Sequence, residues 1–216
     1  MKECAASTHI SNHAFYHFIF SLFHSSLFTL NFYIIVDFHT HNLNTPPGAG
    51  IVCLPQEVLL CPDAFAPVAG ALYAVGIHPW WTAQTDFDGE RHLEALRRLA
   101  THPQVVQIGE CGIDLLRGAE VAAQRELFVH QVSISEEVSK PMTIHCVRAF
   151  DQMLSLKKQL RPSQRWTIHG FRGKPTLARQ LLEAGFDLSF GPLRNEDSYA
   201  LTPPERRHDE TDAEMR

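Results

Sequence analysis

Two histidines stand one residue apart, directly after a run of apolar residues, in the segment "IIVDFHTHN", residues 34–42. Side chains two positions apart on a strand point to the same side, so His39 and His41 are expected to face one way. Two neutral imidazoles on one side are an arrangement that chelates a metal ion. A single buried histidine is more often a hydrogen-bonded part of the core, so the pair needs further ligands to make a site.

Further residues of ligand type end other apolar runs. His78 ends "LYAVGIH", Glu110 ends "VVQIGE", His145 ends "MTIH" and His169 ends "WTIH". If these runs are parallel strands, the five ends meet at one mouth. Histidine with carboxylate suits Zn²⁺, Mn²⁺, Fe²⁺ or a mixed pair, and it fits an all-oxygen Ca²⁺ site poorly. Such an ion would lower the pKa of a bound water and polarise a carbonyl or phosphoryl oxygen.

The elements that must position these residues alternate between strand-like and helix-like patterns. Most of the strand-like runs are apolar throughout, which is typical of parallel strands buried on both faces. Helical patterns lie between them at residues 89–100, 119–139 and 174–185. Seven strands are predicted, with an eighth possible near 206–212, and the seven lie at 33–39, 50–54, 72–78, 105–113, 142–147, 166–171 and 186–191.

This alternation predicts an α/β fold, a TIM-type (β/α) barrel, with an open doubly wound sheet as the alternative. The segments 42–50 and 55–70 are rich in proline and glycine and show little helical period, which predicts a reduced unit after strand one. Neither a GxGxxG motif nor a P-loop is present in the sequence.

Composition limits the classes of function. The net charge of −5 at pH 7 argues against a protein that holds nucleic acid through a broad basic surface, although it allows a compact site for a few phosphates. Thirteen histidines favour metal chemistry or catalysis. The five cysteines include no CxxC pair, which favours a cytoplasmic protein, and Cys111 and Cys146 are expected to be small core residues facing the helices.

Residues 1–33 are nearly continuous in apolar and aromatic side chains and are interpreted as an appended N-terminal extension to a domain over 34–216. A membrane anchor is the alternative. His13, His17 and His24 interrupt the segment, and it runs directly into the first strand, which argues against an anchor.

Six segments carry a family resemblance. "DFHTHN", "AVGIHPWW", "QIGECGIDLLRG", "KPMTIHC", "IHGFRGKPTLARQLLEAGFDLSFG" and "ETDA" resemble, in this order, the signature segments of TatD-type metal-dependent hydrolases, in the shorter bacterial branch. The resemblance covers residues 34 to about 213 and implies a TIM barrel. It also implies a deoxyribonuclease that cleaves phosphodiester bonds with a metal-activated water and two divalent ions (Zn, Mg or Mn). DNA ends or single strands would be its substrate, without a stable nucleic-acid complex.

The resemblance also implies roles for single residues. Glu110 matches a carboxylate that bridges the two metals, and Asp212 in "ETDA" matches an aspartate that binds metal and orients or deprotonates the attacking water. His78 and Arg148 fall in segments that resemble phosphate-contacting positions, which would make His78 a substrate contact. The positions that match metal ligands are His39, His41, Glu110, His145, His169 and Asp212.

The C-terminal end departs from the family pattern. Arg207, His208 and Asp209 stand where a buried last strand should be apolar, which argues against an eighth strand and leaves the place of Asp212 in the site open. The chain stops at Arg216, so the barrel is expected to be truncated and incomplete at this end.

Two other functions stay open. A small-molecule amidohydrolase or phosphoesterase is one, but those enzymes often carry a metal-bridging lysine on a middle strand where this chain has Glu110. The other is an inactive truncated barrel that persists as a binding protein.

Overall fold

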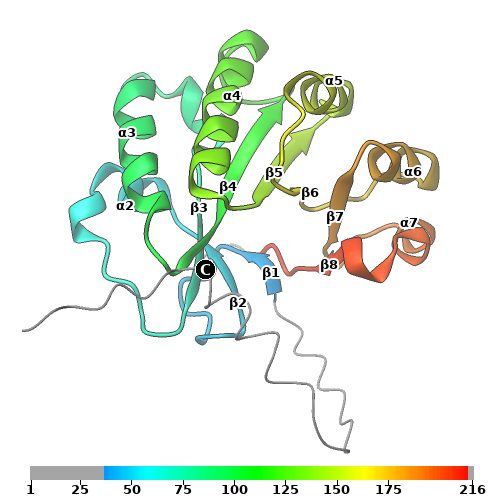
Figure 1. Ribbon diagram of the computed structural model, residues 1–216, viewed down its shortest axis with the longest axis horizontal. Coiled ribbons are helices and arrows are strands. Elements are labelled where there is room, and N and C mark those ends of the chain that lie inside the picture. The colour runs from blue at the N-terminus through cyan, green and yellow to red at the C-terminus, as the bar shows by residue number, and fades with distance from the viewer. Residues whose placement is uncertain (1–36, 214–216) are drawn as a thin grey trace, which may run out of the picture. The chain divides into compact units, whose positions relative to one another are not determined.

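The computed structural model describes residues 37–213, and its eight strands form one parallel sheet in chain order (Figure 1). The strands are β1 (Asp37–Thr40), β2 (Gly50–Cys53), β3 (Leu72–Val75), β4 (Val105–Asp114), β5 (Met142–Val147), β6 (Trp166–Ile168), β7 (Phe186–Phe190) and β8 (Arg207–Asp209). The seven apolar runs are therefore strands, and the predicted TIM-type barrel is confirmed. The predicted extension over residues 1–33, with its membrane-anchor alternative, lies outside the described residues.

Helices connect the strands and cover the outer face of the sheet (Figure 1). They are α2 (Gln56–Leu60), α3 (Gly89–Ala100), α4 (Val121–Val138), α5 (Phe150–Leu160), α6 (Pro175–Glu183) and α7 (Glu196–Leu201). Three 3₁₀ turns, η1 (Pro62–Ala64), η2 (Pro79–Ala83) and η3 (Pro204–Arg206), complete the connections. Between residues 37 and 213, no helix is long and apolar enough to cross a membrane.

The helix limits follow local sequence signals. The Asp88 side chain accepts a hydrogen bond from the N–H of Arg91 and caps α3. Pro175 occupies the first turn of α6, and Gly185, at φ +85°, follows its end. The connection from β1 to β2 contains only turns, and α2 after β2 has five residues, so the predicted reduced unit after strand one is confirmed.

The argument against an eighth strand is wrong. β8 pairs in parallel with β7, with Leu188 opposite Arg207 and Phe190 opposite Asp209. The three polar residues of β8 are only partly buried, so they do not carry the cost of a fully buried central strand.

Residues of other elements contact the polar side chains in and next to β8. His208 stacks on Phe38 of β1 with ring centroids 4.2 Å apart, and the Arg207 guanidinium lies 4.2 Å from the centre of the Tyr199 ring. Asp187 of β7 accepts a hydrogen bond from Nε of Arg206 at 3.1 Å. The strand is therefore stabilised by contacts that the local sequence does not reveal.

The residues after β8 join the last strand to the first. The N–H of Asp212 donates to the carbonyl of His39 (3.1 Å), and the N–H of His41 donates to the carbonyl of Ala213 (3.0 Å). The N–H of Thr211 donates to the Asp37 carboxylate at 2.9 Å. No strand ladder joins β1 to β8 within residues 37–213, so the barrel is nearly closed, with residues 211–213 along its seam.

Candidate metal centre

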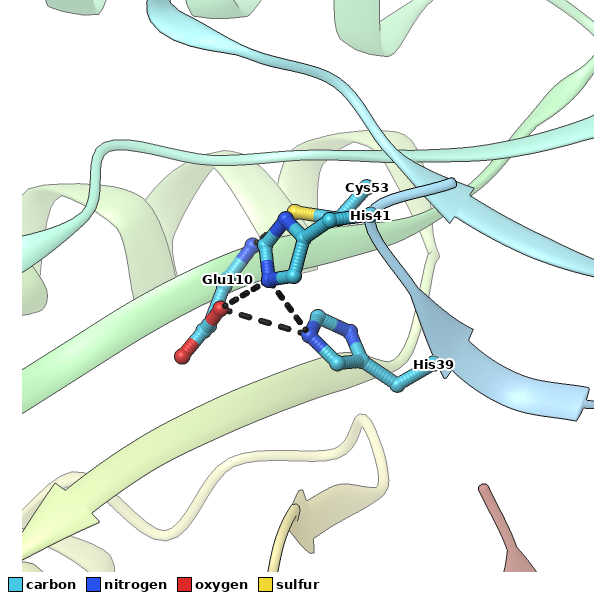
Figure 2. Close-up of side chains that lie close together, drawn as sticks. All are labelled: His39, His41, Cys53 and Glu110. Atoms are coloured by element: carbon cyan, nitrogen blue, oxygen red, sulfur yellow. Dashed lines mark hydrogen bonds and ion pairs between the residues drawn. The ribbon is translucent and has the colours of Figure 1, made fainter. Parts of the chain in front are cut away.

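His39 and His41 lie together at the carboxyl end of β1 (Figure 2). His39 is fully buried and His41 is half-buried. Their Nε2 atoms are 3.2 Å apart, and they lie 3.3 and 3.2 Å from Oε2 of Glu110, respectively. Residues from β1 and β4 therefore form a triangle of donor atoms.

The size of this triangle fits a divalent ion. A tetrahedral ion with bonds of about 2.0–2.1 Å keeps its ligand atoms roughly 3.3 Å apart. An imidazole Nε2 presents a lone pair when the ring proton is on Nδ1, so two such nitrogens and a carboxylate oxygen can together coordinate a cation, whereas without an ion a proton on a ring hydrogen-bonds to Glu110. The donor set, nitrogen with carboxylate oxygen, suits a transition-metal ion.

The other oxygen of Glu110 faces a second group of histidines. Oε1 lies 2.6 Å from Nδ1 of His145, 2.7 Å from Nε2 of His169 and 3.2 Å from Nε2 of His78. Glu110 is only 4% exposed, and its two oxygens face two separate sets of donors. This arrangement allows one carboxylate to bridge two ions.

Close packing of β4 against β5 brings Glu110 to His145. Gly112 of β4 pairs with His145 of β5 and has φ +157°. A Cβ at position 112 would overlap the His145 carbonyl oxygen. A side chain at position 112 would therefore push the strands apart, so glycine is needed at this position.

Electrostatics keep Glu110 ionised. Burial opposes its ionisation, but His169, His145 and His39 stabilise the carboxylate and hold the pKa of Glu110 well below its usual range. Burial also opposes a charge on His169, yet Glu110 and Glu210 raise the pKa of His169 well above its usual range. In the ion-free chain a proton on His169 thus balances Glu110, and a bound cation would replace it.

Asp212 lies at the site even though the charges on β8 left its place open. Its Oδ1 is 3.9 Å from Nε2 of His39 and 4.0 Å from Nε2 of His41, and its side chain is one third exposed. The hydrogen bond from its N–H to the His39 carbonyl fixes its backbone. The sequence-predicted ligands therefore lie together, and their binding of metal stays a prediction.

The two predicted phosphate contacts differ in position. His78 is buried among the donor atoms, and burial lowers its pKa despite the adjacent Glu110. It lines a cavity of about 410 Å³ together with His41, Glu110, His145, His169 and Asp212. Arg148 is exposed just after β5 and is not among the residues that line this cavity.

Two buried carboxylates behind the histidines were missed from the sequence. Asp114 Oδ2 lies 3.0 Å from Nε2 of His145, and Glu210 Oε1 lies 3.5 Å from Nδ1 of His169. A carboxylate on the far nitrogen fixes the ring of a metal-binding histidine and raises its basicity. Asp114 follows Glu110 by four residues on one strand, so alternation offered a signal for it.

The cysteines play different parts in this region. Cys111 is fully buried and Cys146 packs against the core, so the predicted core role of both is confirmed. Cys53 of β2 was not singled out from the sequence, and its sulfur accepts a hydrogen bond from the N–H of Glu110 at 3.3 Å. Burial, reinforced by Glu110, raises the pKa of the Cys53 thiol, so it remains protonated in the ion-free chain.

Replacing Asp114 by asparagine is expected to weaken binding of Zn²⁺ about 10- to 100-fold, because the His145 ring loses the carboxylate that orients it. Competition against a chromogenic chelator measures this affinity. Asp63→Asn is the matched control, since Asp63 is an exposed aspartate that pairs with Arg98 and is not among the residues that line the cavity. Equal affinities in the two variants would contradict the role of Asp114.

Comparisons with known proteins give the family. A family model described as TatD related DNase matches residues 65–213. The "3'-5' ssDNA/RNA exonuclease TatD" of Erwinia tasmaniensis is 35% identical over 114 residues, 51% of this chain and 43% of that protein. The "Uncharacterized metal-dependent hydrolase YcfH" of Escherichia coli K12 is 32% identical over 152 residues, 66% of this chain and 55% of that protein. The chain thus spans about half the length of the curated relatives it matches.

A solved structure supports the fold. The crystal structure of YJJV, a TatD homolog from Escherichia coli K12, matches with a TM-score of 0.65 at 22% identity and covers 83% of this chain and 79% of that one. Fold and site together define a (β/α)₈ barrel with a candidate divalent-metal centre at the carboxyl ends of its strands. The chain belongs to the TatD-related DNase family.

Proposed function

We propose that this chain is a divalent-metal-dependent hydrolase of phosphodiester bonds that degrades single-stranded DNA from an end. The observation that carries the proposal is Glu110, whose two oxygens face separate groups of histidines at 2.6–3.3 Å. A carboxylate shared between two groups of donor atoms is typical of two-metal sites, in which the ions stabilise the attacking and leaving oxygens when a phosphodiester is cleaved. The names of the relatives, which include a single-stranded DNA and RNA exonuclease, support the substrate class.

Two ions would each have their own donor atoms. His39, His41 and Glu110 Oε2 would hold the first, and His145, His169 and Glu110 Oε1 would hold the second. When bound, divalent ions supply positive charge to the phosphate oxygens and lower the pKa of a water molecule. Asp114 and Glu210 keep the His145 and His169 rings turned toward Glu110.

Asp212 and His78 act on the substrate in this proposal. Asp212 is one third exposed at the opening and accepts the proton of the attacking water at Oδ1. His78 is buried in the cavity with a lowered pKa, so it is neutral and donates a hydrogen bond to a phosphate oxygen. Arg148 is exposed beyond the cavity lining and contacts a more distant phosphate.

The shape and charge of the site favour a strand end over a duplex. A cavity of about 410 Å³ has the volume of a small-ligand site, which one nucleotide occupies. The net charge of −5 gives the surface no general attraction for a DNA backbone, so affinity must come from the site itself.

The described cysteines are free, which fits a reducing compartment such as the cytoplasm.

The test uses chain stripped with a chelator and reloaded separately with Zn²⁺, Mn²⁺ and Mg²⁺. We expect a 5′-labelled single-stranded oligonucleotide to shorten stepwise, a blunt duplex to be cut more slowly, and the stripped chain to be inactive. Hydrolysis of simple amides or small phosphodiesters alone would favour the small-molecule alternative. Metal binding without hydrolysis of any of these substrates would contradict the proposal and leave an inactive barrel.

A further inference from the structure

Three large apolar side chains are exposed at the mouth of the barrel. Trp80 (43% exposed) lies in η2 after β3, and Leu115 (43%) and Leu116 (59%) follow β4. All three stand at the carboxyl ends of strands, the same end as the candidate metal centre. Exposed apolar side chains gathered in one place mark a binding surface.

Asp114 holds this surface in place. The indole Nε1–H of Trp80 donates to Asp114 Oδ2 at 2.6 Å, and the N–H groups of Leu116 and Arg117 donate to Oδ1 at 2.7 and 3.1 Å. Because the same carboxylate lies 3.0 Å from Nε2 of His145, the surface is tied to the centre. The Trp80 ring is therefore pre-oriented, and a ligand loses little free energy in ordering it.

A cation completes the surface. The Arg117 guanidinium carbon lies 4.4 Å from the centre of the Trp80 ring, a cation–π distance, and Arg117 is itself exposed. The Trp80 ring centre lies 5.7 Å from that of His145 and 4.8 Å from that of His78. The guanidinium thus lies over one face of the indole, and this cation and ring pair stands next to the histidines of the candidate metal centre.

We propose that Trp80 and Arg117 form a stacking platform for the base of a nucleotide next to the cleaved phosphodiester, a proposal that rests on the proposed function. A nucleobase offers a π face with a phosphate attached, which matches an exposed guanidinium layered on an indole, because a base can stack on the guanidinium plane or on the open indole face while the phosphate meets the positive charge. A base can stack here only when it has left its own helix, so the platform selects single strands. Stacking tolerates every base, so it gives little sequence preference.

The test compares oligonucleotides that differ by one missing base. Abasic nucleotides are introduced one at a time near the cleaved end of a single-stranded DNA, and kcat/KM is measured for each. We expect one position to lower kcat/KM about 5- to 150-fold in the parent, the range that loss of one stacked base gives. In Trp80→Ala this ratio should fall to near one, while Trp80→Phe, which keeps a π face, should retain most of it.

Each variant is compared with itself, as the ratio of kcat/KM for the intact oligonucleotide to kcat/KM for the abasic one. Removing Trp80 also removes its hydrogen bond to Asp114, which contacts His145, but a general loss of activity through this contact lowers both values equally and leaves the ratio unchanged. Val68→Ala, which shortens an exposed apolar side chain before β3, is the matched control and should keep the parental ratio. Equal ratios in the parent and in Trp80→Ala would overturn the platform while leaving the hydrolase intact.

A second readout separates the platform from the proposed function. If the parent hydrolyses no oligonucleotide with Zn²⁺, Mn²⁺ or Mg²⁺, the proposed function fails, and tryptophan fluorescence with a five-nucleotide oligothymidylate then decides the platform. Quenching in the parent and in Val68→Ala that disappears in Trp80→Phe would support it. Quenching that is absent, or unchanged in Trp80→Phe, would overturn it.

Discussion

Replacing Glu110 with glutamine is expected to remove bound divalent metal and to lower hydrolysis by on the order of 10³-fold. Glutamine keeps the shape of the side chain, so the change isolates its charge. Both carboxylate oxygens lie within 3.3 Å of histidine nitrogens, and an amide must turn its NH₂ group toward one of the two donor groups. The histidines that face the NH₂ group then lose their anionic partner, and amide hydrogens occupy the place where a cation would bind.

Elemental analysis of the purified variant and the single-strand assay measure both effects. Glu126→Gln is the matched control, because Glu126 is exposed on α4 and makes the same change of charge. Circular dichroism of both variants separates loss of metal from loss of fold. A Glu110→Gln protein that retains the parental metal content would refute the bridging role.

Replacing Asp212 with asparagine is expected to lower kcat by about 10²- to 10⁴-fold, the range for loss of a positioned proton acceptor. Its Oδ1 lies 3.9 Å from His39 Nε2, outside the triangle formed by His39, His41 and Glu110. That triangle is intact in the variant, so metal should remain bound. The measurements are kcat, KM and metal content in parallel.

The control for Asp212 is an aspartate of β8, the strand that directly precedes it. Asp209→Asn changes a partly buried aspartate of β8 whose carboxylate accepts a hydrogen bond from Tyr199, pairs with Arg194 and is not among the cavity-lining residues. It should keep parental kcat. If Asp212→Asn turns over substrate as fast as Asp209→Asn, residue 212 takes no part in the reaction.

The sheet and the convergence of the ligands were predictable because they depend on local patterns. Continuous apolar runs indicate parallel strands, and parallel strands bring their carboxyl ends together, so His39, Glu110 and His169 had to meet. The same reasoning does not fix side-chain direction beyond the strand ends. Arg148 follows β5 in the predicted place, but it is exposed and lies outside the cavity lining.

β8 and the supporting carboxylate of Glu210 were not predictable for a different reason. The polar residues of β8 are acceptable because His208 lies against Phe38 and Asp187, and Arg207 lies over Tyr199, contacts that exist only after the barrel forms. Glu210 supports His169 across 41 residues of sequence, and no local pattern signals such a pair. Local sequence therefore predicted that the donor residues converge, but it did not predict the Glu210 carboxylate behind His169.

The seam between β1 and residues 211–213 couples metal binding at the candidate centre to the closure of the barrel. Asp37 and Thr211 meet across 174 residues of chain, so this closure is entropically costly and is expected late in folding. His39 and His41 stand on one side of the seam and Asp212 on the other. Because the N–H of Asp212 donates to the carbonyl of His39, an ion that holds His39 and His41 in place also favours the closed seam, and by linkage a closed seam tightens the hold on the ion. Metal affinity and the integrity of the barrel are in this way one equilibrium.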